Sequence, residues 1–352
     1  MKRIGYLYEQ IIDKDNIRKA IINSSKGKRK RINVIKVYDN IEHYTEIIYK
    51  MLSEKSYVPS KYKISIIYDS GNKKFREISK PRYFPDQVIH YCLMQVLEPI
   101  LLKKFYLYSC GSIPRRGTSF GHKHLRRWLD RDIKNTKYCL KMDIRKFYPS
   151  IDKTIIKNKF IKIIKDKDTL WLINSIVDSD CTGIPLGNYT SGWFSNFFLT
   201  DLDNFIKGDL HAKYYIRYVD DLVILDGNKK ELRKMLDSIK GFLKEEKLEV
   251  KHNYQIFEIK KRDLDFLGLR FFREKTILRK RNMLKASRKA IKISKSEAVS
   301  FKDASGIISY YGWIKHSNSY KFYIERIKPY ARIKDMKKLI SNYAKEQNKK
   351  LI

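Results

Sequence analysis

Residues 215–225 read Tyr215-Ile216-Arg217-Tyr218-Val219-Asp220-Asp221-Leu222-Val223-Ile224-Leu225. Apolar and β-branched residues flank a central acidic pair, which predicts a β-hairpin with Asp220 and Asp221 at its tip. Adjacent carboxylates in an apolar segment repel each other and cost desolvation free energy. A bound divalent cation would offset both costs. Alternatively, the pair forms a polar hairpin turn, because Asp favours turns.

A second acidic stretch favours the cation. Residues 139–144, Cys139-Leu140-Lys141-Met142-Asp143-Ile144, predict a short strand that ends at Asp143, and Arg145-Lys146-Phe147-Tyr148-Pro149-Ser150-Ile151-Asp152 follows. Three carboxylates from two strands can hold two Mg²⁺ ions about 4 Å apart, the arrangement that supports in-line phosphoryl transfer.

These two stretches resemble the motifs of reverse transcriptases. The Y-V-D-D box is similar to motif C of that family, and K-M-D-I-R-K-F-Y-P-S-I-D is similar to motif A. The resemblance implies an RNA-directed DNA polymerase, a nucleotidyltransferase with two Mg²⁺ ions for which Mn²⁺ can substitute. It implies that Asp143 and Asp220 bridge the metals, that Asp221 is a weaker ligand, and that Ile144 belongs to the same metal site.

A third stretch lies between the first two. Residues 182–192, Thr182-Gly183-Ile184-Pro185-Leu186-Gly187-Asn188-Tyr189-Thr190-Ser191-Gly192, resemble motif B, where glycines let the backbone approach the nascent base pair and template. The alternative is a plain glycine-rich loop before a core helix. The resemblance implies nucleotide contacts for Leu186 and Gly187 and primer or template contacts for Asn188 and Ser191.

Further site residues follow from the same resemblance. Tyr148, five residues after Asp143, would lie under the sugar and exclude a 2′-hydroxyl, or it is a packed residue. Arg76 would neutralise the incoming triphosphate, or it is an exposed strand arginine. Lys251, in a stretch similar to motif D, would give a proton to pyrophosphate. The remaining primer and template candidates are Arg115, Arg116, Tyr218, Leu267 and Gly268, the last two in a stretch similar to motif E.

The charge balance of the chain indicates a polyanionic partner. Lys and Arg total 76 against 39 Asp and Glu, a net charge of +37 over 352 residues. Nucleic acid is the first candidate, although a lysine-rich residue usage contributes to the excess. The partners expected from the resemblance are a structured template RNA, an RNA–DNA hybrid and dNTPs, with no membrane.

Cysteine spacing and hydropathy restrict the cellular compartment that we expect for the protein. No apolar run is long enough to cross a bilayer, and no signal-peptide core follows Met1. The four cysteines form no C-x-x-C pair, which argues against structural zinc. We therefore expect a cytoplasmic protein of a bacterial or phage-infected cell.

The expected fold is α+β, a right-hand polymerase with an antiparallel-sheet palm, α+β fingers and a helical thumb. Residues 1–135 would form the N-terminal extension and fingers, 136–274 the palm, with 152–182 as a helical return partly in the fingers, and 275–352 the thumb. Strands are expected at 62–68 and 74–78 around a turn at 69–72, and helices at 4–23, 34–52, 152–177, 193–205 and 229–246. His90 is expected to be a satisfied helix residue.

Within the family, the chain resembles the reverse transcriptases of diversity-generating retroelements. Those enzymes write motif B as G-[IL]-P-[IL]-G-N-x-T-S, and most other members carry Gln where this chain has Leu186; Gly192 departs from the retroelement pattern, which has Gln there. The resemblance implies error-prone copying of a dedicated RNA, with a small basic accessory protein. One alternative is an anti-phage defence enzyme whose product DNA is the effector. Another is an RNA-binding scaffold with an inactive polymerase fold.

Overall fold

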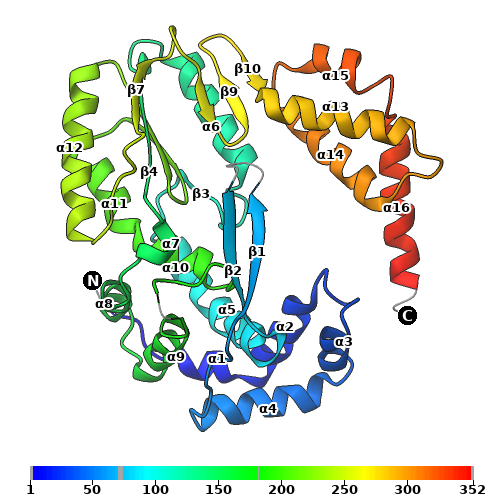
Figure 1. The fold of residues 1–352 in the computed structure, drawn as a ribbon. Coiled ribbons are helices and arrows are strands. Elements are labelled where there is room, and N and C mark those ends of the chain that lie inside the picture. The colour runs from blue at the N-terminus through cyan, green and yellow to red at the C-terminus, as the bar shows by residue number, and fades with distance from the viewer. Residues whose placement is uncertain (1–2, 70–73, 181, 350–352) are drawn as a thin grey trace. The chain divides into compact units, whose positions relative to one another are not determined.

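The computed structural model describes residues 3–69, 74–180 and 182–349 and has a mixed α+β fold (Figure 1). The chain divides into two compact units. The first unit comprises Met1–Pro114, Lys141–Val223 and Arg233–Tyr254, and the second comprises Arg115–Leu140, Ile224–Leu232 and Gln255–Ile352. The palm, fingers and thumb boundaries expected from the sequence stay predictions.

The first unit begins with helices that are shorter than the sequence predicts. The helix expected at 4–23 is divided into α1 (Tyr8–Ile12) and α2 (Lys14–Ser25). Asp13 causes the break, because its carboxylate accepts a hydrogen bond from the Asn16 amide at 2.9 Å and so caps α2. The helix expected at 34–52 is likewise α3 (Ile32–Tyr38) and α4 (Ile41–Ser53).

A two-stranded sheet follows. The antiparallel strands β1 (Lys63–Asp69) and β2 (Lys74–Lys80) confirm the predicted strands, and Ile67 lies opposite Arg76. The predicted turn at 69–72 lies mostly outside the described residues. After the π-helical turn η1 (Tyr83–Gln87) comes the apolar helix α5 (Val88–Leu102). The expectation of a satisfied His90 on α5 is wrong: the side chain is buried and its Nδ1 has no hydrogen-bond partner among the described residues.

The other helices of the first unit are also subdivided. The segment predicted as one helix at 152–177 forms α8 and α9, because Asp166 caps the second of them by accepting from the amides of Asp168 and Thr169. The helices after strand β4 (Tyr138–Asp143) are α7 (Phe147–Ser150), α8 (Lys153–Ile163), α9 (Lys167–Val177), α10 (Ser191–Phe198), α11 (Thr200–Asn204) and the π-helical η2 (Phe205–Asp209).

The largest sheet has five strands in the order β3-β5-β6-β4-β7. Its central strands are apolar along most of their length, as strands covered on both faces are. The helix predicted at 229–246 is confirmed as α12 (Lys229–Glu245). The strands are β3 (Ser109–Cys110), β4 (Tyr138–Asp143), β5 (Tyr214–Tyr218), β6 (Asp221–Asp226) and β7 (Gln255–Glu258).

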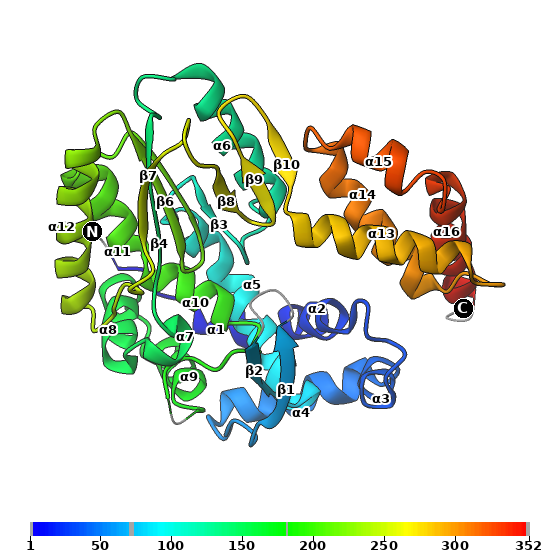
Figure 2. The ribbon, with the colours of Figure 1, turned by 45° about the horizontal axis from the view of Figure 1, so that its top comes forward.

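The second unit contains α6 (Thr118–Arg131) and a three-stranded antiparallel sheet in the order β10-β9-β8. Its C-terminal helices gather in one bundle (Figure 2). No helix in the described ranges is both long and apolar enough to cross a membrane. The elements are β8 (Leu264–Phe266), β9 (Leu269–Phe271), β10 (Thr276–Leu278), α13 (Lys280–Ser294), α14 (Phe301–Lys315), α15 (Tyr320–Arg326) and α16 (Ile333–Lys349).

Candidate active site

The acidic pair lies where β5 turns into β6. Val219 and Asp220 form the turn, and Asp221 is the first residue of β6. Val219 has φ +58°, a left-handed conformation that is strained for a β-branched residue. The Ile144 amide donates to the Asp220 carbonyl at 3.1 Å. This hydrogen bond brings the turn against the end of β4, where Asp143 lies.

Asp143 and Asp220 influence each other electrostatically. Burial raises the pKa of the Asp220 carboxyl, and the charge of Asp143 raises it further, whereas Lys251 and Arg76 lower it. Asp143 is ion-paired with Lys251, whose backbone amide also donates to the Asp143 carbonyl at 2.8 Å. The first unit therefore brings together four of the residues that the sequence analysis selected.

Asp221 has a different neighbour. Its Oδ2 lies 3.8 Å from the Nζ of Lys141, and both side chains are largely buried. Lys141 precedes Asp143 by two residues and so lies on the same face of β4. The sequence analysis did not select Lys141, although a lysine in an apolar strand two residues before a candidate metal ligand was a usable signal.

The carboxylates near the Val219–Asp220 turn suit a divalent cation as a pair. Within residues 3–69, 74–180 and 182–349, no three side chains of His, Cys, Asp or Glu are grouped closely enough to hold a metal ion. Asp143 and Asp220 form a pair in which the charge of one opposes ionisation of the other. A cation between two such groups stabilises both, and Mg²⁺ prefers oxygen ligands. This pair therefore fits a divalent cation.

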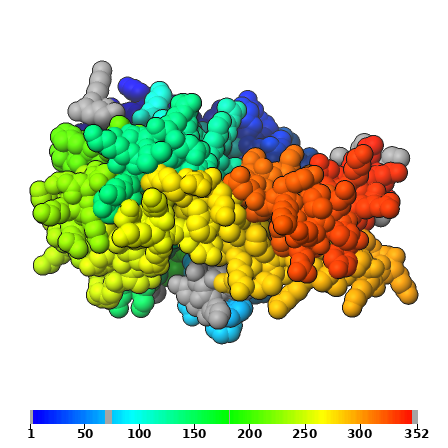
Figure 3. Space-filling model, turned by 90° about the horizontal axis from the view of Figure 1, so that it is seen from above, coloured from blue at the N-terminus to red at the C-terminus, as the bar shows by residue number. Residues whose placement is uncertain are grey.

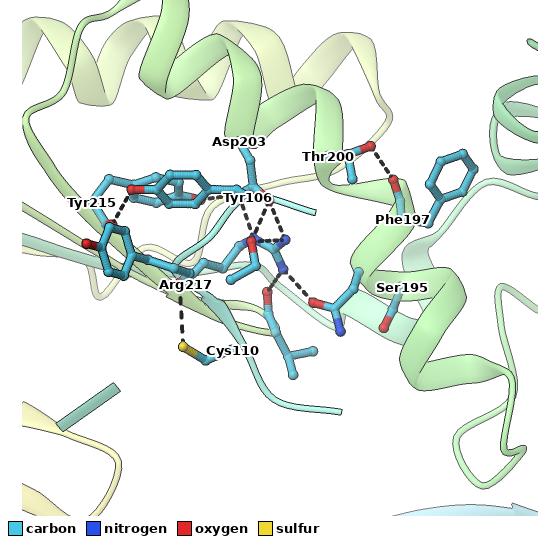
Figure 4. Close-up of polar contacts among 12 residues, drawn as sticks. Tyr106, Cys110, Ser195, Phe197, Thr200, Asp203, Tyr215 and Arg217 are labelled. Carbon is cyan, nitrogen blue, oxygen red and sulfur yellow. Dashed lines mark hydrogen bonds and ion pairs between the residues drawn. The ribbon is translucent and has the colours of Figure 1, made fainter. Parts of the chain in front are cut away.

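A buried ion pair lies next to the turn formed by Val219 and Asp220 (Figure 4). Arg217 on β5 is 0% exposed, and its guanidinium binds both carboxylate oxygens of Asp203, at 2.8 and 2.6 Å. The same guanidinium donates to the Val219 carbonyl at 2.9 Å and to the Asn196 side chain at 3.0 Å. Asp203 also accepts from Tyr215 at 2.7 Å. Arg217 thus fixes the strained residue that precedes Asp220.

The sequence analysis missed Arg217 and Asp203. The available signal was a charged residue inside the apolar strand β5 and acidic residues in the otherwise largely apolar helical stretch that ends at η2. Charged side chains in such places are rarely fully buried unless they are paired. The sequence does not show which residue is the partner.

The glycines of the 182–192 loop allow close backbone contacts. A Cβ at Gly187, which has φ +138°, would overlap the Ser79 carbonyl, and the Ser79 amide donates to the Leu186 carbonyl at 2.8 Å. A Cβ at Gly183 would overlap the Tyr148 carbonyl. The loop is therefore fastened to β2 on one side and to α7 on the other.

Two polar residues of this loop donate hydrogen bonds inside the first unit. The Asn188 amide donates to the Tyr62 hydroxyl at 2.8 Å, and the Ser191 hydroxyl donates to the Pro185 carbonyl at 2.6 Å. A Cβ at Gly192 would lie 2.6 Å from the Cβ of Ser112. Close packing against Ser112 thus gives a physical reason for glycine at this position.

Tyr148 is half-buried on α7, and its hydroxyl accepts from Ser195 at 3.5 Å. Burial raises the pKa of the Tyr148 phenol; the Asp220 charge adds to the shift and Arg76 opposes it. Tyr148 is therefore electrostatically coupled to both Asp220 and Arg76. Tyr218, at the end of β5, is also half-buried and lies against Gly111.

The remaining predicted residues belong to the second unit. Leu267 and Gly268 form the turn between β8 and β9, with φ +49° and +87°. The Leu267 carbonyl lies 3.1 Å from the Nε2 of His122, and the Gly268 carbonyl accepts from the Arg279 amide at 3.1 Å. Arg115 is exposed and Arg116 is half-buried.

Comparison with known proteins gives consistent relatives. A protein with the description retron Ec73 reverse transcriptase, from Escherichia coli, is 31% identical over 144 residues, which cover 37% of this chain and 45% of that protein. The telomerase of Candida tropicalis in complex with a TWJ fragment of telomeric RNA is similar in fold, with a TM-score of 0.50 and 16% identity, over 80% of this chain and 58% of that chain. The chain thus matches about half the length of these relatives.

The profile of the reverse transcriptase (RNA-dependent DNA polymerase) family matches residues 67–271. This range includes β4, the Val219–Asp220 turn and the 182–192 loop. Because the match covers more than half of the chain, the protein belongs to the reverse transcriptase family.

Proposed function

We propose that this chain copies RNA into DNA and that Asp143 and Asp220 hold the divalent ions of the reaction. The observation that carries the proposal is the contact between the Val219–Asp220 turn and β4, which brings a half-buried carboxylate beside a second one. Reverse transcriptase domains generally use divalent metal ions. Such ions stabilise the charge on the attacking and leaving oxygens of an in-line displacement.

The chain's own residues have complementary roles in this proposal. Asp143 and Asp220 provide oxygen ligands, with the Ile144 segment beside them. Arg76 attracts the triphosphate, since a guanidinium binds phosphate oxygens well. Lys251 is ion-paired with Asp143. Its ammonium would release Asp143, bind the leaving pyrophosphate and donate a proton to it.

Replacing either carboxylate tests the proposal. Asp143→Asn or Asp220→Asn should reduce primer extension on an RNA template by at least roughly a hundredfold, because charge stabilisation at the reacting phosphoryl group is lost. Asp237→Asn, on an exposed position of α12, is the matched control and should extend the primer normally. Extension by either active-site variant at the wild-type rate would refute the assignment.

We propose that Tyr148 selects the sugar of the incoming nucleotide. Its ring is half-buried and its hydroxyl is tied to Ser195, so the side chain is held in one place. A fixed ring can exclude a 2′-hydroxyl by collision. The same primer-extension assay with ribonucleotides tests this role: Tyr148→Val should incorporate them, and unchanged discrimination would leave Tyr148 a packing residue.

The finer hypothesis is error-prone copying of a dedicated structured RNA, as in diversity-generating retroelements. The alternative is an anti-phage defence enzyme whose product DNA is itself the effector. Leu186 distinguishes the two. An apolar side chain discriminates less sharply than a hydrogen-bonding one, so error-prone copying predicts fewer misincorporations in Leu186→Gln.

Sequencing of cDNA made from a defined RNA provides the measurement. The Leu186 backbone is fixed by Ser79, so Leu186→Gln changes the side chain without releasing the loop. Fewer errors in the variant, chiefly opposite template adenines, would support the diversification hypothesis. Equal error spectra would favour the alternative.

A further inference from the structure

A cavity of about 520 Å³ in the second unit is lined by cations that no proposed role uses. One wall is the face of α6 that carries Lys123, Arg126, Arg127 and Arg131. Helix α6, the β9–β10 segment and the end of α14 meet on the face shown in Figure 3, in teal, yellow and orange. None of the lining residues belongs to the candidate active site.

Three of these cations lack a compensating charge. Asp130 is the one acidic residue in the lining, and it is ion-paired with Arg126 at 2.6 Å. Arg126 also donates to the carbonyls of Phe272 and Arg273, so both terminal nitrogens of its guanidinium are bound within the protein. The exposed side chains of Lys123, Arg127 and Arg131 have neither an ion pair nor a hydrogen bond within the described part of the chain.

The spacing of the three cations suits a polymer of phosphates. Lys123, Arg127 and Arg131 are four residues apart, which places one cation on each successive turn of α6, about 6 Å from the next. Cations that recognised a single phosphate would converge on one point. A row with one charge per turn instead matches the regular charges of a nucleic-acid backbone.

Two further observations describe the cavity. The pKa of the neighbouring His124 is lowered by partial burial and by the charges of Lys123 and Arg127, which indicates a positive local potential. The opposite wall is held in place by two hydrogen bonds between Asn318 and Thr276. The Asn318 backbone amide donates to the Thr276 carbonyl at 2.6 Å, and the Asn318 side-chain oxygen accepts from the Thr276 backbone amide at 2.8 Å. The site is therefore charged and preformed.

We infer that this basic cavity binds the sugar–phosphate backbone of RNA through Lys123, Arg127 and Arg131, as a site additional to the catalytic residues. The inference rests on the proposed function in one respect, that RNA is a ligand of this chain. Phosphate contacts of this kind position an RNA without reading its sequence.

A triple variant, Lys123→Gln/Arg127→Gln/Arg131→Gln, tests the site in the full chain. The probe is a fluorescein-labelled RNA hairpin of mixed sequence, and anisotropy titrations at several salt concentrations measure its affinity. Loss of three phosphate contacts should lower the slope of log affinity against log salt by about 2–3, and the affinity by on the order of a hundredfold at about 0.1 M salt. The charge-preserving variant Lys123→Arg/Arg127→Lys/Arg131→Lys should retain the wild-type slope.

The matched control is Lys230→Gln/Arg233→Gln/Lys244→Gln, which removes the same charge from exposed positions of α12. An equal loss of slope in this control would refute the site, as would an unchanged slope in the α6 variant. Displacement of polyglutamate from the wild type, with no effect of the α6 variant on RNA, would assign the cavity to an acidic protein instead. Primer extension at saturating primer–template should be unchanged in the α6 variant, so this test is independent of the Asp143 and Asp220 variants.

Discussion

Arg217 carries a full charge in the interior of the first unit. Its guanidinium donates five hydrogen bonds, to Asp203, Asn196, Ser109 and the Val219 carbonyl, and the Asp203 carboxylate compensates its charge. A buried ion pair of this kind adds little net stability, but removing one partner leaves the other charge uncompensated. The contact to Val219 suggests a second consequence, since that carbonyl belongs to the turn that presents Asp220.

Removal of the guanidinium separates these two consequences. Arg217→Met should reduce the free energy of unfolding by about 3–5 kcal/mol, because Asp203 is left buried and unpaired. Arg217→Met/Asp203→Leu should recover much of that stability, yet primer extension should stay low because the Val219 carbonyl still lacks its donor. Urea denaturation and extension rates measure the two effects. If the double variant restores both, Arg217 has no role in positioning the turn.

At this scale, the sequence predicted the residues whose chemistry is visible locally. Adjacent Asp220 and Asp221 stand out because paired carboxylates are unusual in an apolar strand. Arg217 does not stand out in this way, because its partner Asp203 lies 14 residues earlier in another element. Whether a buried charge stabilises or destabilises the protein depends on its partner, and only the folded structure identifies that partner.

At the scale of elements, the 182–192 loop shows what its glycines do. Gly187 lets the loop lie directly on β2, where the Ser79 amide binds the Leu186 carbonyl. The sequence predicted a glycine that permits close approach to a nucleotide. The structure adds an approach to a neighbouring strand, which the sequence could not reveal because β2 is about a hundred residues away along the chain.

Gly187→Ala tests this contact. The new Cβ would overlap the Ser79 carbonyl in a left-handed backbone conformation, so the loop must shift. We expect a loss of about 1–3 kcal/mol in the free energy of unfolding, together with slower primer extension. Gly241→Ala, on α12 with no atom near the new Cβ, should instead be neutral or stabilising by about 0.5–1 kcal/mol. Equal thermal melting of the two variants would contradict the role of Gly187.

The positions at which helices begin and end were the least predictable feature of the secondary structure. Asp13 directly follows α1 and Asp166 lies shortly after the end of α8, and each caps the start of the next helix with its side chain. Hydrophobic periodicity continues across both positions, so the pattern predicted single long helices. An Asp inside a helical pattern is compatible with either a cap or an exposed surface position, and the chain reversal that selects the cap depends on tertiary packing.

At the scale of the whole molecule, the net charge of +37 does not identify the surface that binds a partner. Many cations are paired within the fold, such as Lys159 with Asp201 and Glu246. The three cations on α6 have no such partner in the described part of the chain, and all three line one cavity. The composition predicted a polyanion, and the structure was needed to select a site for it.

Buried histidines give the molecule a dependence on pH. Burial lowers the pKa of His90 in the first unit to about 4 and that of His122 in the second unit to about 4. The unfolded chain has histidine pKa values of about 6.5, so between these limits it binds protons that the folded chain excludes. Stability from these groups is therefore complete above about pH 6.5 and is lost as the pH falls toward 4.

His90→Leu should remove part of this dependence. His90 is 2% exposed and its Nδ1 has no partner among the described residues, so a leucine loses no hydrogen bond at that atom. For wild type, we expect His90 to lower the free energy of unfolding by about 2 kcal/mol between about pH 7 and about pH 5. His90→Leu should be at least as stable as wild type at neutral pH and should lose about that much less on acidification. His252→Leu, at an exposed position, is the control and should follow the wild-type curve. Parallel urea-denaturation curves for wild type and His90→Leu across this range would show that His90 takes up its proton in the folded chain as readily as in the unfolded one.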